Sequence, residues 1–348
     1  MPDSYSVAIL GATGMVGQEF IKILEQRQFP VAKLKLLASP RSAGKRLKFR
    51  GEEIEVTAVA EDSFDGVDVA LFSAGAGVSK QWAPVAVRAG AVVVDNSSGW
   101  RMEADVPLVV PEVNGDDALR HNGIIANPNC STIQMVVALW PIHQVNPIKR
   151  VVVSTYQSVS GAGSKAVREL DRLTRDSLAG AELQPAVFAH PIAFNCVPEI
   201  DVFFDDGYSK EEWKMLVETR KIMHEPELPV SATTVRVPVA LGHAEAVNVE
   251  LAEPMDPATA RELLRRAPGV EVRDDPRNHV YPLQTHAAGT DPVYVGRIRQ
   301  DSSHPNGLVM WIVADNIRKG AALNAVQIAE LLIQRGAIRR QPSAAMSR

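Results

Sequence analysis

The feature that most constrains the fold is a glycine-rich turn near the N-terminus. A short apolar strand, residues 6–10, leads into Gly11-Ala-Thr-Gly14-Met-Val-Gly17, and a helical pattern follows at residues 20–24. Glycine lets a backbone approach a pyrophosphate closely, and the N–H groups at a helix start face an anion. The spacing therefore favours a dinucleotide-binding turn over a tight turn that merely needs glycine.

Further strand and helix patterns extend this turn into a sheet. Short apolar strands are predicted near residues 34–38, 67–73 and 91–94. A short helix between the last two ends at Gly90, because glycine is favoured just past a helix C-terminus. Strands that alternate with helices of modest length are typical of a parallel, doubly wound sheet. The pattern predicts an α/β, Rossmann-like first domain up to about residue 130.

The pattern changes after residue 130. Long alternating strands with helices between them indicate an α+β second domain with a mixed or antiparallel sheet. The strands are expected at 149–158, 233–241, 246–251 and 307–314, with helices between them at 164–178 and 210–223. A final helix is expected at 321–334. We therefore expect a first domain of residues 1–130, completed by residues 316–348, and a second domain of residues 131–315.

The end of the second predicted strand bears on which dinucleotide is bound. An NAD-binding domain places Asp or Glu there, about 20 residues past the glycines, to bind the ribose hydroxyls. This chain instead carries Ser39, Arg41 and Ser42, without a carboxylate. A cation with two hydroxyls suits a 2′-phosphate, which favours NADP(H) as the cofactor. The competing interpretation is a solvated basic loop, because three more basic residues follow between 45 and 48.

One of the two cysteines stands at a predicted helix start. Asn129 is a good N-cap, which places Cys130 in the first turn of the helix that follows. The N–H groups and dipole of a helix start favour thiolate, and with the Asn129 side chain they are suited to hold an oxyanion. Acyl transfer through a thioester requires such a pairing. An isolated cysteine is otherwise a small buried hydrophobe, which is our interpretation of Cys196.

A thiolate nucleophile usually needs a base, and His243 has the most suggestive setting of the eight histidines. It follows the predicted strand 233–241, whose valines alternate onto one face. Gly242 allows a bulge that would turn His243 off that face. Arg236 lies opposite the valines, as a side chain aimed at a cleft would. Periodicity alone favours neither a catalytic nor a structural role for His243.

Composition and charge exclude several classes of function. The chain has 348 residues with a formal net charge of −4, so nothing favours nucleic acid or an anionic membrane as a partner. No apolar run approaches the roughly 20 residues of a spanning helix, and the N-terminus lacks a signal-peptide pattern. With two cysteines and no metal-binding cluster, the sequence predicts a cytoplasmic protein without metal or a disulfide framework.

The motifs, in this order, resemble the aspartate-semialdehyde dehydrogenase family over nearly the whole chain. The resembling stretches are 11–17 (GATGMVG), 39–44 (SPRSAG), 95–101 (DNSSGWR), 127–132 (NPNCST), 157–163 (QSVSGAG), 211–214 (EEWK), 236–243 (RVPVALGH) and 315–316 (DN). The glycine turn alone is weak support, whereas the ordered set is very specific. The chain departs from the family at Gly99-Trp100, where Ala-Phe is more common; Trp100 is an aromatic residue of the same kind, so Arg101 is little affected.

The resemblance implies a role for each matching residue. Cys130, beside Asn129, would attack L-aspartyl 4-phosphate and be acylated, His243 would act as general acid/base, and Gln157 would orient the thioester. Arg236 would clamp the substrate carboxylate with its planar fork.

The remaining implied contacts concern the substrate amine, the phosphate and the cofactor. Glu211 would meet the amine, and Arg101 and Lys214 would bind the leaving phosphate. Ser160, Gly161 and Asn316 would contact the nicotinamide end of NADP(H). The rest of the implied cofactor site comprises Gly11, Thr13, Gly14, Met15, Val16, Gly17, Ser39, Arg41 and Ser42.

The implied reaction is the reversible, phosphate-dependent reduction of L-aspartyl 4-phosphate to L-aspartate 4-semialdehyde. It belongs to the biosynthesis of lysine and diaminopimelate, threonine, methionine and isoleucine. The family's second domain usually carries a dimer interface, which makes a homodimer the expected assembly and a tetramer possible. The expected partners are thus a small-molecule substrate and inorganic phosphate, with no metal.

Each implied residue also has a simpler interpretation. Arg101 could be a solvated loop cation, and Glu211 with Lys214, three apart on a helix, could be a surface ion pair. Gln157 could cap a strand edge, and Asn316 the last helix. Two other functions also remain: a reductase like that of N-acetylglutamyl phosphate, whose cysteine sits in a different setting, and a non-catalytic dinucleotide-binding relative. The presence of both thiol and phosphate cations argues against the latter.

Overall fold

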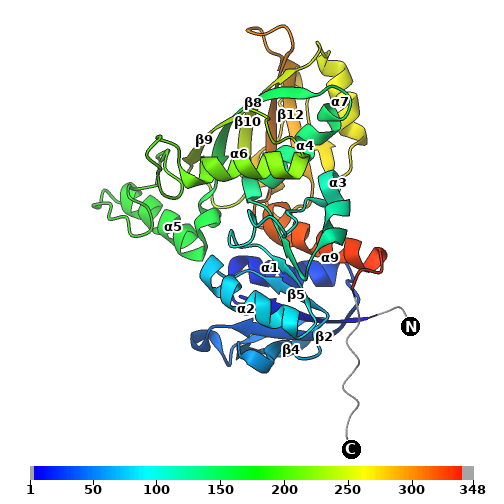
Figure 1. The fold of residues 1–348 in the computed structure, drawn as a ribbon. Coiled ribbons are helices and arrows are strands. Elements are labelled where there is room, and N and C mark those ends of the chain that lie inside the picture. Colours follow the sequence, from blue (N-terminus) through cyan, green and yellow to red (C-terminus); the bar gives the residue numbers. More distant parts are fainter. Residues whose placement is uncertain (1–3, 339–348) are drawn as a thin grey trace, which may run out of the picture. The chain divides into compact units, whose positions relative to one another are not determined.

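The computed structural model describes residues 4–338, which form two compact units (Figure 1). Among the described residues the first unit comprises 4–128 and 321–338, and the second comprises Asn129–Gly320. The expected domains met at residues 130/131 and 315/316, close to these divisions. No helix between residues 4 and 338 has both the length and the apolar character that a bilayer span requires.

The first unit is built on a seven-stranded sheet in the order β3-β4-β2-β1-β5-β6-β7. Within it the β3–β4 pair is antiparallel and the other pairs are parallel. The strands are β1 (Tyr5–Leu10), β2 (Val31–Ala38), β3 (Arg46–Phe49), β4 (Glu52–Ala58), β5 (Val69–Phe72), β6 (Val92–Asp95) and β7 (Ile124–Ala126). Strands β5 and β6 are buried at every residue, as expected for parallel strands covered on both faces.

Helices cover this sheet, and one of them comes from the C-terminal end of the chain. The helices are α1 (Met15–Gln26), α2 (Ala76–Arg88), α3 (Pro111–Asn114) and α9 (Leu323–Gln334). Apolar residues of α1 and α9 share one core with the sheet, among them Phe20, Leu24, Val326 and Leu332. The parallel α/β fold predicted for this part is thereby confirmed. A π-helical turn, η6 (Arg318–Ala322), precedes α9 and delays its start past the expected residue 321.

The second unit is built on a six-stranded mixed sheet in the order β11-β12-β13-β10-β8-β9. The β8–β9 and β11–β12 pairs are parallel, and the others are antiparallel. The strands are β8 (Ile148–Gln157), β9 (Val230–Arg236), β10 (His243–Leu251), β11 (Val270–Val272), β12 (Val293–Gln300) and β13 (Gly307–Ala314). This mixed sheet confirms the predicted α+β second domain.

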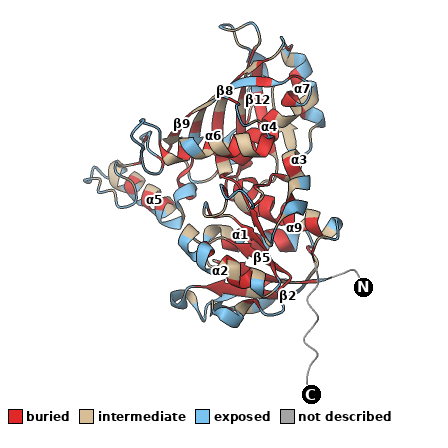
Figure 2. Cartoon of the chain, in the orientation of Figure 1, coloured by how far each residue is buried: buried red, intermediate tan, exposed pale blue. Residues whose placement is uncertain are grey.

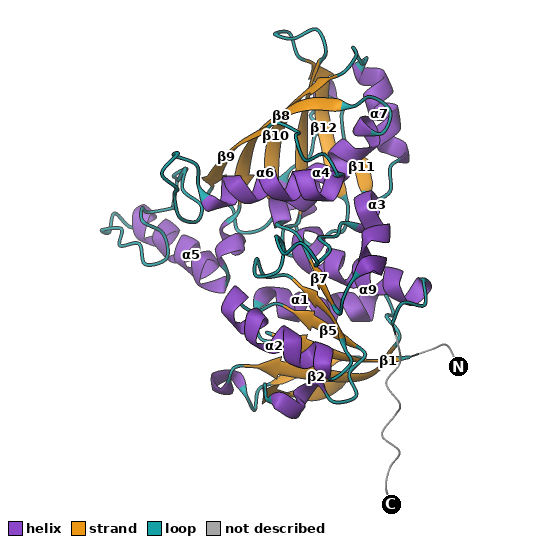
Figure 3. Cartoon of the chain, viewed as in Figure 1, coloured by secondary structure: helices purple, strands orange, loops and turns teal. Residues whose placement is uncertain are grey.

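Helices lie against one face of the second sheet (Figure 3). Helices α4 and α6 lie on this face. The helices of the second unit are α4 (Cys130–His143), α5 (Ser164–Leu178), α6 (Lys210–Met223), α7 (Pro257–Arg266) and α8 (Gln284–Ala287). Helix α4 is buried along almost its whole length (Figure 2), because its residues are apolar on nearly every side.

The sequence prediction was wrong about where one strand ends and the next begins. Strands were expected at 233–241 and 246–251, but β9 ends at Arg236 and β10 already begins at His243. Pro238 cannot donate to a ladder, and Gly242 has φ of +86°. A Cβ on Gly242 would lie 2.9 Å from the carbonyl oxygen of Gln284, so this turn requires glycine. His243 therefore opens a strand instead of following one.

Candidate active site

Three neighbouring strands of the second unit carry site residues at adjacent ends. Gln157, the last residue of β8, pairs in register with Arg236, the last of β9, and with His243, the first of β10. Residues paired across adjacent strands point to the same face of a sheet. The three side chains therefore share one face, and each is at most 5% exposed.

Helix α4 begins with Cys130, and Asn129 is its N-cap. The Asn129 Oδ1 atom accepts hydrogen bonds from the N–H groups of Ser131 (3.0 Å) and Thr132 (3.3 Å). The Asn129 backbone N–H donates to Glu218 Oε2 at 2.6 Å. These bonds fix the first turn that holds Cys130. They also occupy the Asn129 side chain that was expected to face an oxyanion.

Glu211, on α6, connects these two groups of residues. Its Oε1 atom accepts from Asn129 Nδ2 (2.9 Å) and from Gln157 Nε2 (3.2 Å). Burial raises the pKa of Glu211, but the charge of Lys214 and the three hydrogen bonds outweigh it, so the net shift is downward. Glu211 is thus held as a carboxylate beneath the start of α4.

Lys214 is the cation of this cluster. Its Nζ atom lies 3.0 Å from Glu211 Oε2 and 2.8 Å from Asp201 Oδ2, and its side chain is only 13% exposed. Burial lowers its pKa, but the two carboxylates raise it by more. The pair of Glu211 and Lys214 is therefore embedded in the unit and differs from an ordinary surface ion pair.

Arg236 is buried, and its Nη1 donates to the carbonyl oxygen of Ser158 at 2.8 Å. Burial lowers the pKa of the guanidinium, and the negative charges of Glu211 and of the Cys130 thiolate oppose this shift. Cys130 therefore lies within electrostatic reach of Arg236. A cation so close to the thiol favours its ionised form.

His243 is fully buried and neutral. Burial, followed by the charge of Arg236, lowers its pKa to about 3. The backbone N–H of Ser158 donates to Nδ1 at 3.1 Å, and the Ser158 hydroxyl lies equally close. Because a backbone N–H can only donate, the ring proton resides on Nε2. That atom has no hydrogen-bond partner among residues 4–338, so it is available to a reacting group.

Two glycines allow the backbone to approach these side chains. A Cβ on Gly161 would lie 2.9 Å from Arg236 Nη1 and 3.4 Å from His243 Nε2. A Cβ on Gly320 would lie 2.7 Å from the Cβ of Cys130. The sequence reasoning singled out Gly161 but missed Gly320 and Ser158. Gly320 could have been noticed because it is a glycine within a helical pattern, residues 318–322, and such a glycine often has a packing or functional reason.

Asn316 organises the turn that carries Ser158 and Ser160. Its Oδ1 atom accepts from both hydroxyls at 3.1 Å and from the N–H of Gly242 at 2.9 Å. Asn316 therefore ties the turn after β8 to the residue that precedes His243. Asp315 accepts from the N–H groups at the start of η6, so Asn316 is not needed as a helix cap.

The glycine turn of the first unit requires glycine at two positions. Gly11 has φ of +90°, and a Cβ there would lie 2.3 Å from the Ser73 carbonyl oxygen. A Cβ on Gly17 would lie 2.1 Å from the Gly11 carbonyl oxygen. Gly14 is the N-cap of α1, without a side-chain cap and without an acidic residue in the first turn. This backbone cradle fits a pyrophosphate.

The loop expected to select the cofactor lies at the end of β2. Ser39, Arg41 and Ser42 form or flank a 3₁₀ turn, η1 (Pro40–Ser42), and Arg41 is exposed. Thr13 Oγ1 donates to Ser42 Oγ at 3.3 Å, which connects this loop to the glycine turn. The polar groups expected for a 2′-phosphate are thus next to the predicted pyrophosphate turn.

Arg101 lies in the loop after β6 of the first unit. It is 8% exposed, and its Nη2 donates to the carbonyl oxygen of Asn96 at 2.8 Å. The neighbouring Trp100 donates to Ser79 Oγ at 3.0 Å, and Lys80 Nζ lies 3.8 Å from its ring centroid. Arg101 is therefore held by its loop and is not a fully solvated cation. Within residues 4–338 no group of three His, Cys, Asp or Glu side chains is arranged to hold a metal ion.

Comparison with known proteins defines the class. Residues 6–121 match the family described as "Semialdehyde dehydrogenase, NAD binding domain", and residues 139–319 match "Semialdehyde dehydrogenase, dimerisation domain". The chain is thus an oxidoreductase of the semialdehyde dehydrogenase class, with a nicotinamide dinucleotide as cofactor.

Individual relatives narrow the class. The aspartate-semialdehyde dehydrogenase of Aquifex aeolicus is 59% identical over 338 residues, which cover 96% of this chain and 99% of the relative. A crystal structure of aspartate semialdehyde dehydrogenase II of Vibrio cholerae, complexed with ASA, has a TM-score of 0.93 and 50% identity, covering 95% and 99% of the two chains. The Candida albicans enzyme, solved with NADP, has a TM-score of 0.73 and 27% identity, covering 97% and 100%.

The chain therefore belongs to the aspartate-semialdehyde dehydrogenase family, whose members serve amino-acid biosynthesis. The resemblance noted in the sequence is confirmed, and a reductase of N-acetylglutamyl phosphate is not favoured.

Proposed function

We propose that the protein catalyses the reversible, phosphate-dependent reduction of L-aspartyl 4-phosphate to L-aspartate 4-semialdehyde through a thioester on Cys130. The observation that carries the proposal is the convergence of a helix-start thiol, a guanidinium and a neutral imidazole in the second unit. The membership of the family supplies the substrate. A single thiol in such a setting is suited to acyl transfer.

Cys130 is the nucleophile of the proposed reaction. The helix start and the Arg236 charge stabilise the thiolate, which attacks the acyl carbon. A carbon–sulfur bond forms, and the phosphate leaves with the electron pair of its carbon–oxygen bond. When bound, the nicotinamide cofactor supplies the hydride that reduces the thioester. The carbon–sulfur bond then breaks, which releases the aldehyde and regenerates the thiolate.

His243 serves this sequence through Nε2. In the tautomer that Ser158 fixes, Nε2 donates a hydrogen bond, first to the thiolate and then to the oxygen that becomes negative when hydride adds. The Ser158 hydroxyl also lies 3.1 Å from Nδ1, and it can accept a hydrogen bond from a protonated Nδ1 once the ring turns away from the Ser158 N–H, which gives the other tautomer. This second arrangement would let Nε2 act as the general base implied by the family resemblance.

The substrate groups have matching partners around Cys130. We assign the substrate carboxylate to Arg236, whose planar guanidinium suits bidentate binding. Glu211 is held as a carboxylate and can accept the substrate amine, and Gln157 beside it orients the thioester. Asn129 keeps the first turn of α4 in place.

Two cations with little exposure to solvent are assigned to phosphate. Lys214 in the second unit keeps its charge, since its pKa is raised, and Arg101 in the first unit is anchored by its own loop. Phosphate carries more charge than one cation balances, and Lys and Arg are the side chains that commonly bind it. Each cation is assigned, on the family resemblance, to the phosphate that leaves or that attacks in the reverse reaction.

We propose NADP(H) as the particular cofactor. Gly11, Gly14 and Gly17 would hold the pyrophosphate, with Thr13, Met15 and Val16 along the same turn. Ser39, Arg41 and Ser42 would bind the 2′-phosphate, since no carboxylate stands at this position to repel it. Ser160, Gly161 and Asn316 would face the nicotinamide. We accordingly propose that residues 1–130 together with 316–348 form the cofactor domain. Residues 131–315 would form the catalytic domain.

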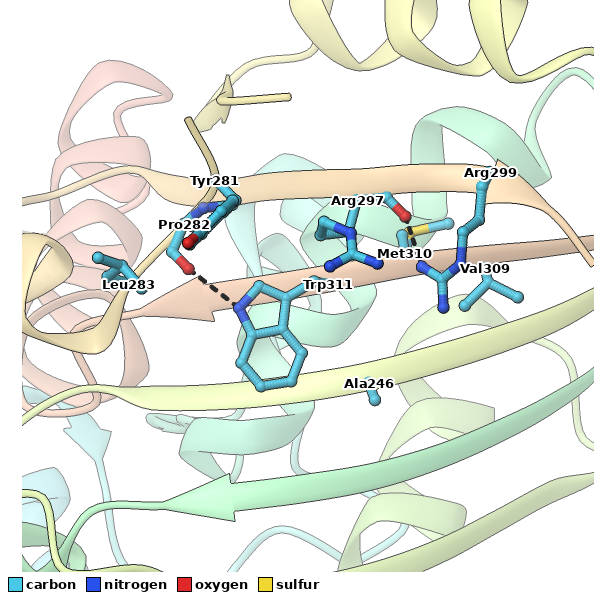
Figure 4. Close-up of a pocket in the computed structure, with 9 residues that line it drawn as sticks. All are labelled: Ala246, Tyr281, Pro282, Leu283, Arg297, Arg299, Val309, Met310 and Trp311. Atoms are coloured by element: carbon cyan, nitrogen blue, oxygen red, sulfur yellow. Dashed lines mark hydrogen bonds between the residues drawn. The ribbon is translucent and has the colours of Figure 1, made fainter. Parts of the chain in front are cut away.

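The assembly we propose is a homodimer formed through the second unit. The sheet face opposite α4 carries half-exposed or exposed residues, including Tyr156 and Trp311, whose rings lie 5.3 Å apart. A hollow of about 440 Å³ lies on this side between Trp311, Tyr281, Arg297 and neighbouring residues (Figure 4). An open sheet face of this kind is a suitable surface for a second copy. Sedimentation of the purified protein tests this: a monomer would contradict the proposal, and a tetramer would extend it.

The decisive experiment runs the reaction in reverse. L-aspartate semialdehyde, NADP and inorganic phosphate are supplied, and the formation of NADPH is followed by absorbance. We expect turnover that depends on all three. Absence of activity, or activity that is independent of phosphate, would show that the assigned reaction is wrong.

A further inference from the structure

A carboxyl group is buried in the second unit without a charged partner. Glu245, on β10, is fully buried, and neither of its oxygens has a hydrogen bond of good geometry among the described residues. Its register partners are Thr155 on β8 and Ile312 on β13. The Gln134 side chain, on α4, lies close enough to act on the carboxyl, and its amide atoms are equally without another partner. A buried polar group without a hydrogen bond is costly, so this arrangement calls for a function.

The protonation state of this carboxyl follows from its surroundings. Burial raises the pKa of Glu245 well above its ordinary value, and the neighbouring Gln134 amide counteracts this only in part. Between residues 4 and 338 no charged group contributes to this pKa shift. A carboxylic acid has one donor and one acceptor, which complement the oxygen and the NH₂ group of an amide. The neutral acid and Gln134 can therefore satisfy each other within the core.

The positions of the two residues relate them to the proposed catalytic pair. Gln134 follows Cys130 by four residues, so both lie on one face of α4. Glu245 follows His243 by two residues, so both point to one face of β10. Four residues span about 6 Å of helix and two residues span about 6.6 Å of strand. The Gln134–Glu245 contact is thus spaced to lie directly behind Cys130 and His243.

We propose that Glu245 is a positioning residue which, as a neutral acid paired with Gln134, sets the register of α4 over β10. It thereby keeps the Cys130 thiol aligned with the His243 ring. The proposal rests on the proposed function in its roles for Cys130 and His243. Neither Glu245 nor Gln134 touches the reacting atoms.

The test compares three substitutions at this contact in a Cys196→Ala background, which leaves Cys130 as the single thiol. Glu245→Gln keeps shape and neutrality, Glu245→Leu removes the polar link, and Gln134→Leu with Glu245→Leu replaces both partners by apolar groups. We expect the double variant to fold, because replacing both partners of a buried hydrogen bond by apolar groups can leave the free energy of unfolding nearly unchanged. Val247→Ala is the matched control, since Val247 is equally buried on the same face of β10.

The readouts are kcat, KM for each substrate, thermal stability and the pH dependence of Cys130 alkylation by iodoacetamide. We expect Glu245→Leu and the double variant to lower kcat by about tenfold or more and to shift the alkylation profile, since misplaced groups lose rate steeply. Glu245→Gln should retain most of the wild-type kcat. Val247→Ala should lower the melting temperature and leave the alkylation profile unchanged.

Two outcomes would overturn the proposal. If the double variant and Val247→Ala gave the same alkylation profile as the parent, Glu245 would be a structural residue only. If the infrared difference between the parent and Glu245→Gln showed a carboxylate instead of a protonated carboxyl, the neutral pairing would be wrong. The alkylation and infrared measurements need no turnover. A parent protein that lacks semialdehyde activity would therefore count against the proposed function without deciding this proposal.

Discussion

The two units build their sites in different ways. In the first unit the predicted pyrophosphate cradle is backbone from one stretch, and glycines at 11 and 17 are required by contacts of 2.3 Å and 2.1 Å that a Cβ would make. In the second unit the proposed catalytic groups are side chains that lie far apart in the sequence. Strand pairing and helix packing bring them together. A local backbone site can be identified from spacing alone, whereas a side-chain site depends on register.

The largest effect is expected at the side-chain site. Cys130→Ala removes the only atom proposed to bond covalently to the substrate, so turnover should fall by at least about three orders of magnitude. NADP affinity should remain nearly unchanged, because the predicted cradle belongs to the other unit. Steady-state assays and fluorescence titration with NADPH measure the two quantities. Cys196→Ala is the matched control, since Cys196 is exposed and the expectation that it is buried was wrong. Loss of activity in this variant would show that the wrong thiol was chosen.

The backbone site is tested by two alanine substitutions in one turn. Gly17→Ala places a Cβ 2.1 Å from the Gly11 carbonyl oxygen, so it should lower the melting temperature and weaken NADP binding at least about tenfold. Gly14→Ala meets that oxygen at 3.3 Å, so the backbone must shift by only a few tenths of an ångström. It should impair NADP binding with little loss of stability. If Gly14→Ala bound NADP like the wild type, the turn would not be the pyrophosphate site.

A smaller effect is expected where one side chain selects between cofactors. Arg41→Ala should reduce the preference for NADP over NAD by about tenfold or more, since a hydrogen bond to a charged group contributes about 1.5–3 kcal/mol. The ratio of kcat/KM for the two cofactors measures this. Lys48→Ala, in the same basic stretch, is the control and should leave the ratio unchanged. Equal effects of both substitutions would favour a general basic loop over a specific 2′-phosphate contact.

The parts of the fold that sequence predicted best are those with a strong period. Helices 164–178 and 210–223 and strand 307–314 were predicted with the observed bounds. Strands β3 and β7 were missed because they are short, and β4 because its residues are mostly polar and exposed. Strand β12 was missed because Gly296 and Arg297 interrupt its alternation. Helix α2 begins at Ala76, well before the expected short helix. Its first part was not predicted because Gly75, Gly77 and Pro84 are residues that disfavour a helix. Tertiary packing overrides these local preferences.

The candidate site shows the same limit of local information. The helix start at Cys130 could be read from Asn129, a local signal. The contacts of Glu211 with Asn129 and Gln157 could not be predicted from the sequence, because they depend on how α6 packs beside α4 and β8. The turn at Gly242 likewise hid the start of β10, so the face on which His243 lies follows only from the observed register.

The smallest expected effect is the loss of folding stability that the buried His243 imidazole causes at acidic pH. The pKa of His243 is lowered to about 3 in the folded state, against about 6.5 in the unfolded state. Between these values the unfolded state binds more protons, so stability must fall as the pH falls. Between pH 6.5 and pH 5 this one group should remove about 1.5 kcal/mol of the free energy of unfolding.

His243→Gln should abolish this part of the pH dependence, and urea unfolding at pH 7, 6 and 5 measures it. The difference between wild type and variant is the proper quantity, because Glu245 contributes with the opposite sign: its raised pKa makes the folded state bind the extra proton. That contribution cancels in the difference. His121→Gln, in the first unit, is the comparison, since burial also lowers the pKa of His121 but the residue is only partly buried. A smaller slope change at His121 is expected, because both burial and the Arg236 charge act more weakly there than at His243. Equal slopes would contradict the larger pKa shift of His243.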